Sequence, residues 1–387
     1  MIKALKEGGL EDAGAMLFAN NPMSLVCSLV CNHERQCEGH CVLGRKGQPV
    51  HVSSIENYIS DTCLERIDVQ CQPKNGKKVA VIGAGPAGIT IAIMLTQRGY
   101  SVTIFDSRDK IGGVLQYGIP EFRLPKAILE RYKKKLLSMG IRIRPNTTIG
   151  GALEIKDLFR DGYESIFIGT GVWRPKKLGI KGESLGNVHF AIDYLANPDA
   201  YDLGDRVAVI GVGNSAMDVA RTAVRLGTSE VSVIYRRSEK EMPAGKDEII
   251  EAREEGVKLI AMASPVEFLG AEGKVTGIHL VRRKETDYGS DGRRRTAHIP
   301  DSDFFLECDG IVTAINQDVD HQVYRTTHVE VAKNGKLDIG RFTSETGESG
   351  VFAGGDVSPW GANVVIHAIA DGKKAAMKID QYLGGKG

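Results

Sequence analysis

Val79–Gly88 reads Val-Ala-Val-Ile-Gly-Ala-Gly-Pro-Ala-Gly, an apolar run that leads into a complete G-x-G-x-x-G motif. The run predicts a buried β-strand over Lys78–Ile82, and the apolar residues after it predict a helix to Leu95 that stops at Gly99. A second strand is expected at Ser101–Phe105, and Asp106 follows it directly. Strand, glycine turn, helix, strand and acid in this order indicate a dinucleotide-binding β-α-β unit, because an isolated glycine turn would lack the flanking elements.

Each position of this motif has a physical role. Gly83 permits the tight turn, Gly85 lets the backbone approach a pyrophosphate, and Gly88 allows the helix to pack closely on the strand. Pro86 and Ala87 stand at the start of the expected helix, whose N-terminus faces the phosphates. The Asp106 carboxylate is placed to hold ribose hydroxyls.

The same unit occurs a second time. The letters of Val79–Gly83 reappear without change at Val207–Gly211, and the glycine motif continues as Gly-Val-Gly-Asn-Ser-Ala to Ala216. Two dinucleotide-binding openings in one chain predict two nucleotide sites. The candidate contacts of the second site are Gly211, Gly213, Asn214 and Ser215.

The second unit differs from the first where its second strand ends. Val231–Tyr235 is followed by Arg236 and Arg237 in place of an acid. An acid there would repel a 2′-phosphate, whereas guanidinium groups pair with it, so the sequence favours NADP(H) over NAD(H). The alternative is that both arginines are solvated loop residues.

The chain has 7 cysteines, and only Cys308 lies beyond residue 71. Four of them gather in residues 27–41: Cys27, Cys31, Cys37 and Cys41. The paired C-x2-C knuckles of zinc sites are absent, and thiolates around an irregular loop suit a [4Fe–4S] cluster. Zinc and free thiols remain alternatives. The absence of any C-x-x-C also excludes a dithiol mechanism.

The composition is that of an ordinary globular protein. The 387 residues suggest two or three domains, with 42% hydrophobic and 26% charged residues. A formal net charge of +1 gives no field that would attract nucleic acid or an anionic membrane. There is no run of eighteen apolar residues and no apolar signal core, so we expect a cytoplasmic protein.

The rest of the sequence predicts further helices, a linker and an antiparallel meander. Residues 1–25 predict one or two short helices, and Gln72–Lys77 predicts a polar linker. Residues 264–313 alternate like an antiparallel meander. A strand is expected at 350–356 and a final helix from about Ala362 to Tyr382.

Several segments resemble the family of the small subunit of NADPH-dependent glutamate synthase. Its relatives include the N-terminal part of dihydropyrimidine dehydrogenase and the NADPH-binding subunits of electron-bifurcating transhydrogenases. The segments are Asn21-Pro22 leading into Cys31–Gly44, then Gly112–Lys126, Gly169–Pro175, Tyr235–Pro243 and Phe352–Asp356. The Gly-Ile-Pro-x-Phe-Arg-Leu-Pro run within Gly112–Lys126 is the most specific of them.

The resemblance implies three cofactors. The first unit would hold FAD, with Asp106 on its ribose, Asp356 on the ribityl chain and the last helix directed at the flavin. Further flavin-site residues implied in this way are Gly113, Val114, Leu115, Arg123, Gly171, Gly355, Ala362 and Asn363. The second unit would hold NADP(H) through Gly213, Asn214, Ser215, Arg236 and Arg237. The cysteine region would hold a [4Fe–4S] cluster.

The sequence departs from the family pattern in three places. Longer members carry an additional N-terminal cysteine segment and bind two clusters, so we expect one cluster here. Relatives assign Cys31 and Cys37 to one cluster and Cys41 to the other, and they place a Gln or Glu ligand where Glu56 stands. Cys27, Cys41 and Glu56 therefore compete for the two remaining positions. Finally, Asn316 replaces an expected glycine.

Together these patterns predict an α/β protein with two Rossmann-like, disulfide-reductase-like domains for FAD and NADP, preceded by a small helical iron–sulfur domain. The expected domains are residues 1–72 for the cluster, 76–175 with 311–387 for FAD, and 176–310 for NADP(H). The expected function is an oxidoreductase subunit that moves electrons between NADP(H) and a partner redox subunit covering the N-terminal cluster. A self-contained flavin reductase and a docking subunit with vestigial nucleotide sites are the alternatives.

Overall fold

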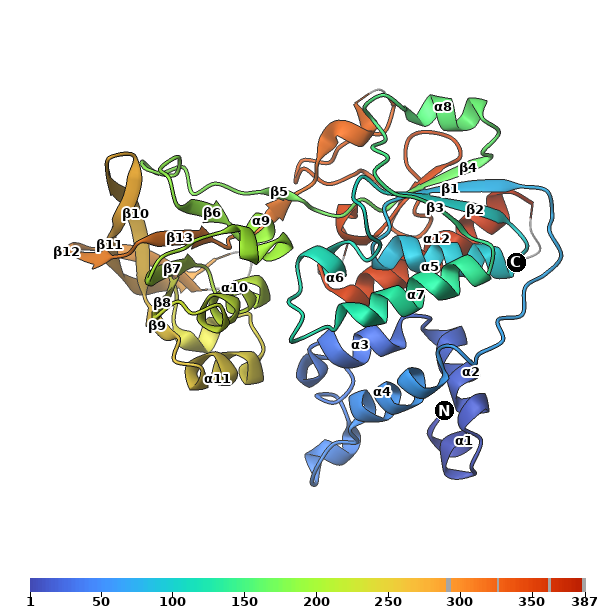
Figure 1. The fold of residues 1–387 in the computed structure, drawn as a ribbon, viewed down its shortest axis with the longest axis horizontal. Helices are drawn as coiled ribbons and strands as arrows, with labels where there is room; N and C mark the ends of the chain where they lie inside the picture. Colours follow the sequence, from blue (N-terminus) through green and yellow to red (C-terminus); the bar gives the residue numbers. More distant parts are fainter. Residues whose placement is uncertain (290–293, 326, 361–362, 385–387) are drawn as a thin grey trace. The chain divides into compact units, whose positions relative to one another are not determined.

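The computed structural model describes residues 1–289, 294–325, 327–360 and 363–384 (Figure 1). The chain divides into two compact units. The first unit contains Met1–Gln116, Glu121–Arg174 and Asp318–Gly387, and the second contains Tyr117–Pro120 and Pro175–Gln317. Two short strands, β5 (Arg174–Pro175) and β14 (Gln317–Asp318), lie where the chain passes from one unit to the other.

The N-terminal part of the first unit is helical. Its helices are α1 (Ile2–Lys6), α2 (Leu10–Asn20), α3 (Ser24–Val30) and α4 (Val52–Cys63), with 3-10 turns η1 (His33–Arg35) and η2 (Val42–Arg45). Ala13, Leu17, Ile59 and Cys63 form a small core between α2 and α4. The predicted short helices before residue 25 are confirmed. The cysteine region is more regular than the expected loop, because Cys27 lies within α3.

The rest of the first unit is built on a five-stranded parallel sheet of order β15-β4-β1-β2-β3. The strands are β1 (Lys78–Ile82), β2 (Ser101–Phe105), β3 (Arg142–Arg144), β4 (Ser165–Ile168) and β15 (Val351–Ala353). Strands β1 and β2 have the predicted bounds of the first β-α-β unit. Each carries four consecutive buried residues, as expected for a strand covered on both faces.

Helices cover one face of this sheet (Figure 1). They are α5 (Pro86–Gln97), α7 (Lys126–Ser138) and α12 (Val365–Tyr382). Two shorter helices, α6 (Val114–Tyr117) and α8 (Ile155–Arg160), belong to the same part of the unit. Helix α12 lies so close to α5 that a Cβ at Gly372 would come within 2.7 Å of the Ala87 carbonyl oxygen. The opposite face is covered by apolar side chains from residues 149–158 and 319–339. The 3-10 turns η5 (His321–Tyr324) and η6 (Gly355–Val357) belong to this unit.

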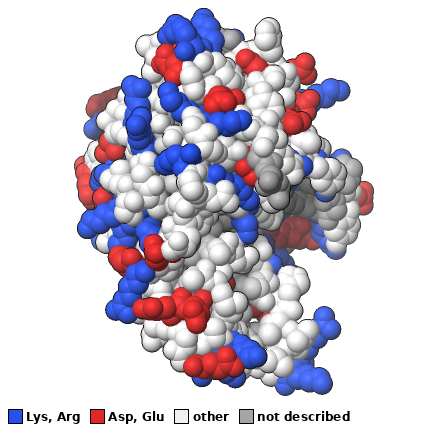
Figure 2. All heavy atoms as spheres, turned by 90° about the vertical axis from the view of Figure 1, so that its right-hand side faces the viewer, with Lys and Arg blue, Asp and Glu red and all other residues white. Residues whose placement is uncertain are grey.

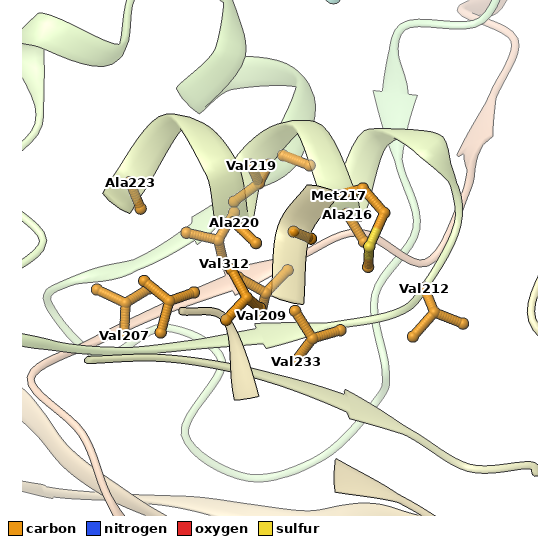
Figure 3. Packing of buried hydrophobic residues seen from close by; sticks show 14 of the residues in the cluster. Val207, Val209, Val212, Ala216, Met217, Val219, Ala220, Ala223, Val233 and Val312 are labelled. Carbon is orange, nitrogen blue, oxygen red and sulfur yellow. The ribbon is translucent and has the colours of Figure 1, made fainter. Parts of the chain in front are cut away.

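The second unit repeats the architecture with a five-stranded parallel sheet of order β6-β13-β7-β8-β9. Its strands are β6 (Val188–Phe190), β7 (Arg206–Ile210), β8 (Glu230–Tyr235), β9 (Lys258–Ala261) and β13 (Gly310–Thr313). Its helices are α9 (Ala191–Ala196), α10 (Asn214–Arg225) and α11 (Lys246–Glu254), with 3-10 turns η3 (Pro198–Ala200) and η4 (Glu239–Glu241). Figure 3 shows valines of the central strands packed under Ala216, Val219 and Ala220 of α10.

An antiparallel three-stranded sheet is inserted in the second unit, in the order β10-β11-β12. Its strands are β10 (Ala263–Ala271), β11 (Lys274–Tyr288) and β12 (Arg294–Glu307). The predicted meander is therefore confirmed up to residue 307. Its assignment to residues 310–313 is wrong, because β13 pairs in parallel with β6 and β7. Gly310–Thr313 is buried throughout, so the fully covered parallel sheet determines its place.

Acidic and basic side chains are interspersed on the face of the molecule shown in Figure 2, in agreement with the nearly neutral net charge. Within the described part of the chain, no single helix has the length and apolar character needed to cross a membrane. The bent pair α2–α3 passes that test only when its two helices are taken together.

Candidate functional site

The first glycine loop needs its glycines for different reasons. Gly83 has a φ of +104°, and a Cβ there would lie 2.5 Å from the Gly169 carbonyl oxygen. A Cβ at Gly88 would lie 1.9 Å from the Gly83 carbonyl oxygen, so only glycine allows α5 to approach β1 this closely. A Cβ at Gly85 would meet nothing within 4 Å. Gly85 therefore faces open space at the N-terminus of α5, where Pro86 is the first helical residue.

Three segments that are distant in sequence meet this loop. The Gly112 amide donates to the Ala84 carbonyl oxygen at 2.8 Å, and a Cβ at Gly113 would lie 3.0 Å from the Gly85 Cα. The Ala84 amide donates to Asp106 Oδ2 at 2.6 Å. A Cβ at Gly355 would lie 3.2 Å from the Ala87 Cβ. The structure thus brings the turn 112–115, the strand-end acid and the 355–356 turn to one helix N-terminus.

Burial shifts the pKa values of two carboxyl groups at this site, those of Asp106 and Asp356. Burial raises the pKa of Asp106, although amide hydrogen bonds from Ala84 and Arg108 act in the opposite direction. Burial also raises the pKa of Asp356 to about 6, and the nearby Lys336 ammonium partly offsets this effect. A buried carboxylate is shielded from water, so a ligand hydroxyl that donates a hydrogen bond to it stabilises its charged form.

The remaining residues of the first site lie around this centre. Leu115 is buried, Val114 is exposed, and Arg123 is half-buried. Gly171 has a φ of +73° in a loop in which Trp173 Nε1 donates to the Thr170 carbonyl oxygen at 2.8 Å.

The final helix begins later than predicted. Helix α12 starts at Val365, two residues after Asn363, whose side-chain oxygen accepts a hydrogen bond from Lys336 Nζ at 2.8 Å. The predicted start at Ala362 lies outside the described residues.

The second glycine loop has the same construction in the second unit. Gly211 has a φ of +125°, and a Cβ there would lie 2.4 Å from the Ala314 carbonyl oxygen. Gly213 precedes α10, and a Cβ on it would meet nothing within 4 Å. Asn214 and Ser215 form the first turn of α10, so their backbone amides are among those that an α-helix leaves without internal partners.

The two arginines follow β8, as the sequence predicts. Arg236 is exposed and Arg237 is half-buried. A third arginine, Arg283, is fixed beside them by Thr296 and Ser264. Burial lowers the pKa of Arg283, and the Arg236 charge adds to this effect, which places the two guanidinium groups near each other. The end of β8 is therefore a concentrated positive site.

The backbone conformation of Asn316 accounts for the glycine that the family pattern places at this position. Its φ is +106°, a conformation that glycine adopts readily and that asparagine tolerates better than most residues. Asn316 therefore adopts a positive φ, a conformation that a glycine would adopt readily.

The four clustered cysteines occupy different elements. Cys27 lies in α3, Cys31 caps its C-terminus, and Cys37 and Cys41 lie in the turns that follow. This segment is tied to α4, because Glu38 accepts hydrogen bonds from the Ser53 amide at 2.9 Å and the Ser53 hydroxyl at 2.6 Å.

Three of these thiols share one electrostatic environment. The interaction between the Cys27 and Cys31 thiols lowers the pKa of Cys27 and raises that of Cys31. Burial raises the pKa of Cys37, and the Glu56 carboxylate acts in the same direction on all three thiols. Burial raises the pKa of Glu56 itself. Cys41 is held separately, since the amides of Val50, Leu43 and Gly44 lower its pKa.

Open space at Gly85 and Gly213 fits two dinucleotide pyrophosphates, because each lies at a helix N-terminus where a side chain would intrude. The cysteine segment supplies soft thiolates, which suit an iron–sulfur cluster. In the described ranges, no three His, Cys, Asp or Glu side chains converge closely enough to hold a metal ion. The donor chemistry of this segment therefore fits the cluster.

The class of protein is defined by this combination of two dinucleotide folds and an N-terminal cysteine domain. Residues 44–154 and 77–372 match the family of pyridine nucleotide-disulphide oxidoreductases. Residues 1–67 match dihydropyrimidine dehydrogenase domain II, described as a 4Fe-4S cluster domain.

Known proteins resemble nearly the whole chain. The NADP(+)-dependent formate dehydrogenase subunit beta of Moorella thermoacetica is 36% identical over 99% of this chain, which spans 58% of that protein. The NADPH glutamate synthase small chain of Escherichia coli is 34% identical over 99% of this chain and 85% of its own. FprA from Mycobacterium tuberculosis, solved in complex with NADPH, shares the fold with a TM-score of 0.69, 18% identity and coverage of 81% of this chain and 85% of its own.

The chain belongs to the pyridine nucleotide-disulphide oxidoreductase family, in the branch of the glutamate synthase small chain. It is an oxidoreductase whose cofactors are FAD, NADP(H) and a 4Fe-4S cluster. These conclusions confirm the predicted fold class, family and cofactors.

Sequence reasoning missed several residues that shape the first site. Lys336 contacts Asn363 and faces Asp356, while Asp371 Oδ2 accepts the Gly355 amide at 3.1 Å. The Thr170 hydroxyl is buried beside Gly83 without a hydrogen-bond partner in the described structure. Thr170 lies within the quoted segment Gly169–Pro175, but Lys336 and Asp371 belong to none of the quoted motifs, so only their spatial position reveals those two.

Proposed function

We propose that this chain is an electron-transfer subunit that carries electrons between NADP(H) and a partner redox protein. FAD would occupy the domain formed by residues 76–175 and 311–387, NADP(H) that of 176–310, and the cluster that of 1–72. The observation that carries the proposal is the pair of open glycine loops, each at a helix N-terminus, joined in one chain to a cysteine domain.

The residues of the first site have distinct proposed roles. The backbone at Gly85 and the first turn of α5 would face the FAD pyrophosphate, and Asp106 would accept hydrogen bonds from its ribose. Asp356 would accept one from the ribityl chain, and the turn from Gly113 to Leu115 would line the flavin. Gly171, Arg123 and Asn363 would complete its surroundings.

The residues of the second site would select the nicotinamide cofactor. Gly213, Asn214 and Ser215 would present backbone amides to the pyrophosphate, while Arg236 and Arg237 would bind the 2′-phosphate. When bound, FAD accepts a hydride as an electron pair and releases electrons singly, as a one-electron cluster requires. No side-chain general base is needed for this chemistry.

The cluster would be ligated by Cys31, Cys37 and two of Cys27, Cys41 and Glu56. The Cys27 and Cys31 thiols are close enough for each to shift the pKa of the other, which supports membership of Cys27 in the set. For the fourth position, thiolate softness favours Cys41, whereas the shared electrostatic environment favours Glu56. The variants Cys41→Ser and Glu56→Ala decide between them, with Cys71→Ser as the exposed-thiol control. The variant that loses the native cluster spectrum identifies the ligand.

The partner would cover the cysteine domain. Val42 and Leu43, directly after Cys41, are 70% and 56% exposed, which is unusual for apolar side chains beside a redox centre. The partner is either a glutamate synthase large subunit or the NADH- and ferredoxin-handling subunits of an electron-bifurcating transhydrogenase assembly. The expected compartment is the cytoplasm, where thiols stay reduced.

The direct test is anaerobic purification followed by cofactor analysis. We expect flavin absorbance near ~450 nm that NADPH bleaches, and about four iron and four sulfide per chain. A colourless protein would instead support a docking subunit, and a single zinc without sulfide would exclude the cluster. Isolation of the tagged chain from its host should recover redox subunits. A lone chain that rapidly reduces a small acceptor would favour the self-contained reductase.

A further inference from the structure

Helix α7 is the element that connects the cysteine helices to the flavin turn. Its N-terminal residue Lys126 donates from Nζ to the Leu115 carbonyl oxygen at 2.8 Å. One turn later, the Leu129 side chain lies where a Cβ on Gly112 would be only 2.9 Å away. The turn formed by residues 112–115 therefore rests on the first two turns of α7.

The middle of α7 lies near α3, which carries Cys27. The Tyr132 side chain is fully buried, and its hydroxyl lies next to the backbone of Leu25 in the first turn of α3. The Cys27 thiol is close enough to act electrostatically on Tyr132.

The same part of α7 caps the C-terminus of α4, which carries Glu56. Arg131 Nη2 donates to the Asp61 carbonyl oxygen at 2.5 Å and to Glu65 Oε2 at 2.9 Å, and its other nitrogens bond both carboxylates. Lys135 Nζ bonds the Ile67 carbonyl oxygen. Cations at a helix C-terminus satisfy carbonyl groups and complement the helix dipole. Arg131 lowers the pKa of Glu65 through their hydrogen bond.

We propose that α7 is a rigid mount that fixes the cysteine domain relative to the flavin turn, with Arg131 and Tyr132 as its positioning residues. Lys126 and Tyr132 are separated by about 9 Å along the helix axis, so both attachments lie on one short rod. Electron transfer weakens steeply with distance, and a rigid mount keeps the separation constant. The mount makes and breaks no bond. This inference rests on the proposed electron-transfer function.

The test compares Arg131→Glu with the charge swap Arg131→Glu/Glu65→Arg in the cofactor-loaded chain. Arg160→Gln is the control, because Arg160 is an exposed arginine of the same unit that pairs with Asp157 and Asp161. Stopped-flow absorbance separates flavin reduction by NADPH from subsequent cluster reduction. Hydrogen–deuterium exchange of the α4 amides provides a readout that does not depend on turnover.

For Arg131→Glu we expect unchanged flavin reduction, cluster reduction slower by about tenfold, and exchange in α4 faster by about tenfold. The charge swap should restore both only in part, because it renews the ion pair with position 65 but not the hydrogen bond to the Asp61 carbonyl oxygen. Arg160→Gln should change neither. Tyr132→Phe, which keeps the ring, should show the same pattern more weakly. The proposal would be wrong if the rate of cluster reduction were unchanged in Arg131→Glu. It would also be wrong if the rates of flavin and cluster reduction fell by the same factor. Failure of NADPH to reduce wild-type flavin would contradict the proposed function instead.

Discussion

The two β-α-β units begin with the same five residues but are built into different surroundings. Helix α5 carries no charged residue and is buried along almost its whole length, because α12 packs against its outer side. Helix α10 carries Arg221, which pairs with Glu251 and Glu255 beside α11. The strand-end residue also differs, with Asp106 in one unit and Arg236 in the other. An identical strand therefore specifies the sheet, while the variable positions specify the neighbour and the ligand.

The largest expected effect is the loss of one nucleotide site by a substitution that leaves the other site intact. Gly85→Val should reduce bound flavin to below about a tenth, because a side chain would fill the space proposed for the pyrophosphate. Gly213→Val should retain flavin but lose reduction by NADPH. Flavin absorbance of the purified variants measures the first effect. Full flavin in Gly85→Val would show that this loop does not bind it.

The second prediction concerns the strand ends. Changing Arg236 and Arg237 to Ser should remove roughly 2–4 kcal/mol of preference for NADPH over NADH while leaving NADH use nearly intact. The ratio of kcat/KM for the two cofactors measures this preference. Arg253→Ser, an exposed arginine paired with Glu239, is the control. Equal wild-type rates with both cofactors would contradict the assignment.

The third prediction compares the last position of each glycine motif. Gly88→Ala should cost about 2–4 kcal/mol of stability, because its Cβ would collide with the Gly83 carbonyl oxygen. The reciprocal change, Ala216→Gly, should cost only about 1 kcal/mol, as expected for glycine in a helix. Shifts of the urea midpoint, followed by circular dichroism, measure both. Similar midpoints for the two variants would mean that both helices approach their strands equally closely.

The smallest effect is the pH dependence that Asp356 confers on the flavin-free chain. Its folded pKa is about 6, above its ordinary value of 3.8, so the folded chain binds a proton more tightly than the unfolded chain. The resulting stability is complete below pH 3.8 and is lost as the pH rises through 6, by roughly 1–3 kcal/mol. Asp356→Asn should remove this slope in melting temperature between about pH 4 and pH 7, the range that spans the unfolded and folded pKa values. Asp202→Asn, at an exposed position, should leave the slope unchanged.

Much of the fold follows directly from local sequence. The strands β1 and β2 have the predicted bounds because a run of four buried residues in each, apolar except for Thr103, leaves little choice of structure. The prediction that Gly310–Thr313 belongs to the antiparallel meander is wrong, because a short apolar run has no periodicity that distinguishes parallel from antiparallel pairing. The start of α12 at Val365 was also misplaced, because Asn363 is held by Lys336 outside the helix.

The sequence alone determined the two nucleotide folds and the cluster of candidate ligand cysteines, because glycine and cysteine spacings encode backbone geometry and ligand chemistry locally. The assignment of FAD and of a [4Fe–4S] cluster came from the resemblance of longer segments to a known family. Only the tertiary structure showed that turn 112–115, Asp106 and Gly355 meet at the N-terminus of α5. It alone placed Arg283 beside Arg236 and revealed the contacts that α7 makes with the cysteine helices. These contacts join residues far apart in the chain, and their side chains are common surface types. No local pattern marks them, so their meaning arises only when folding brings them together.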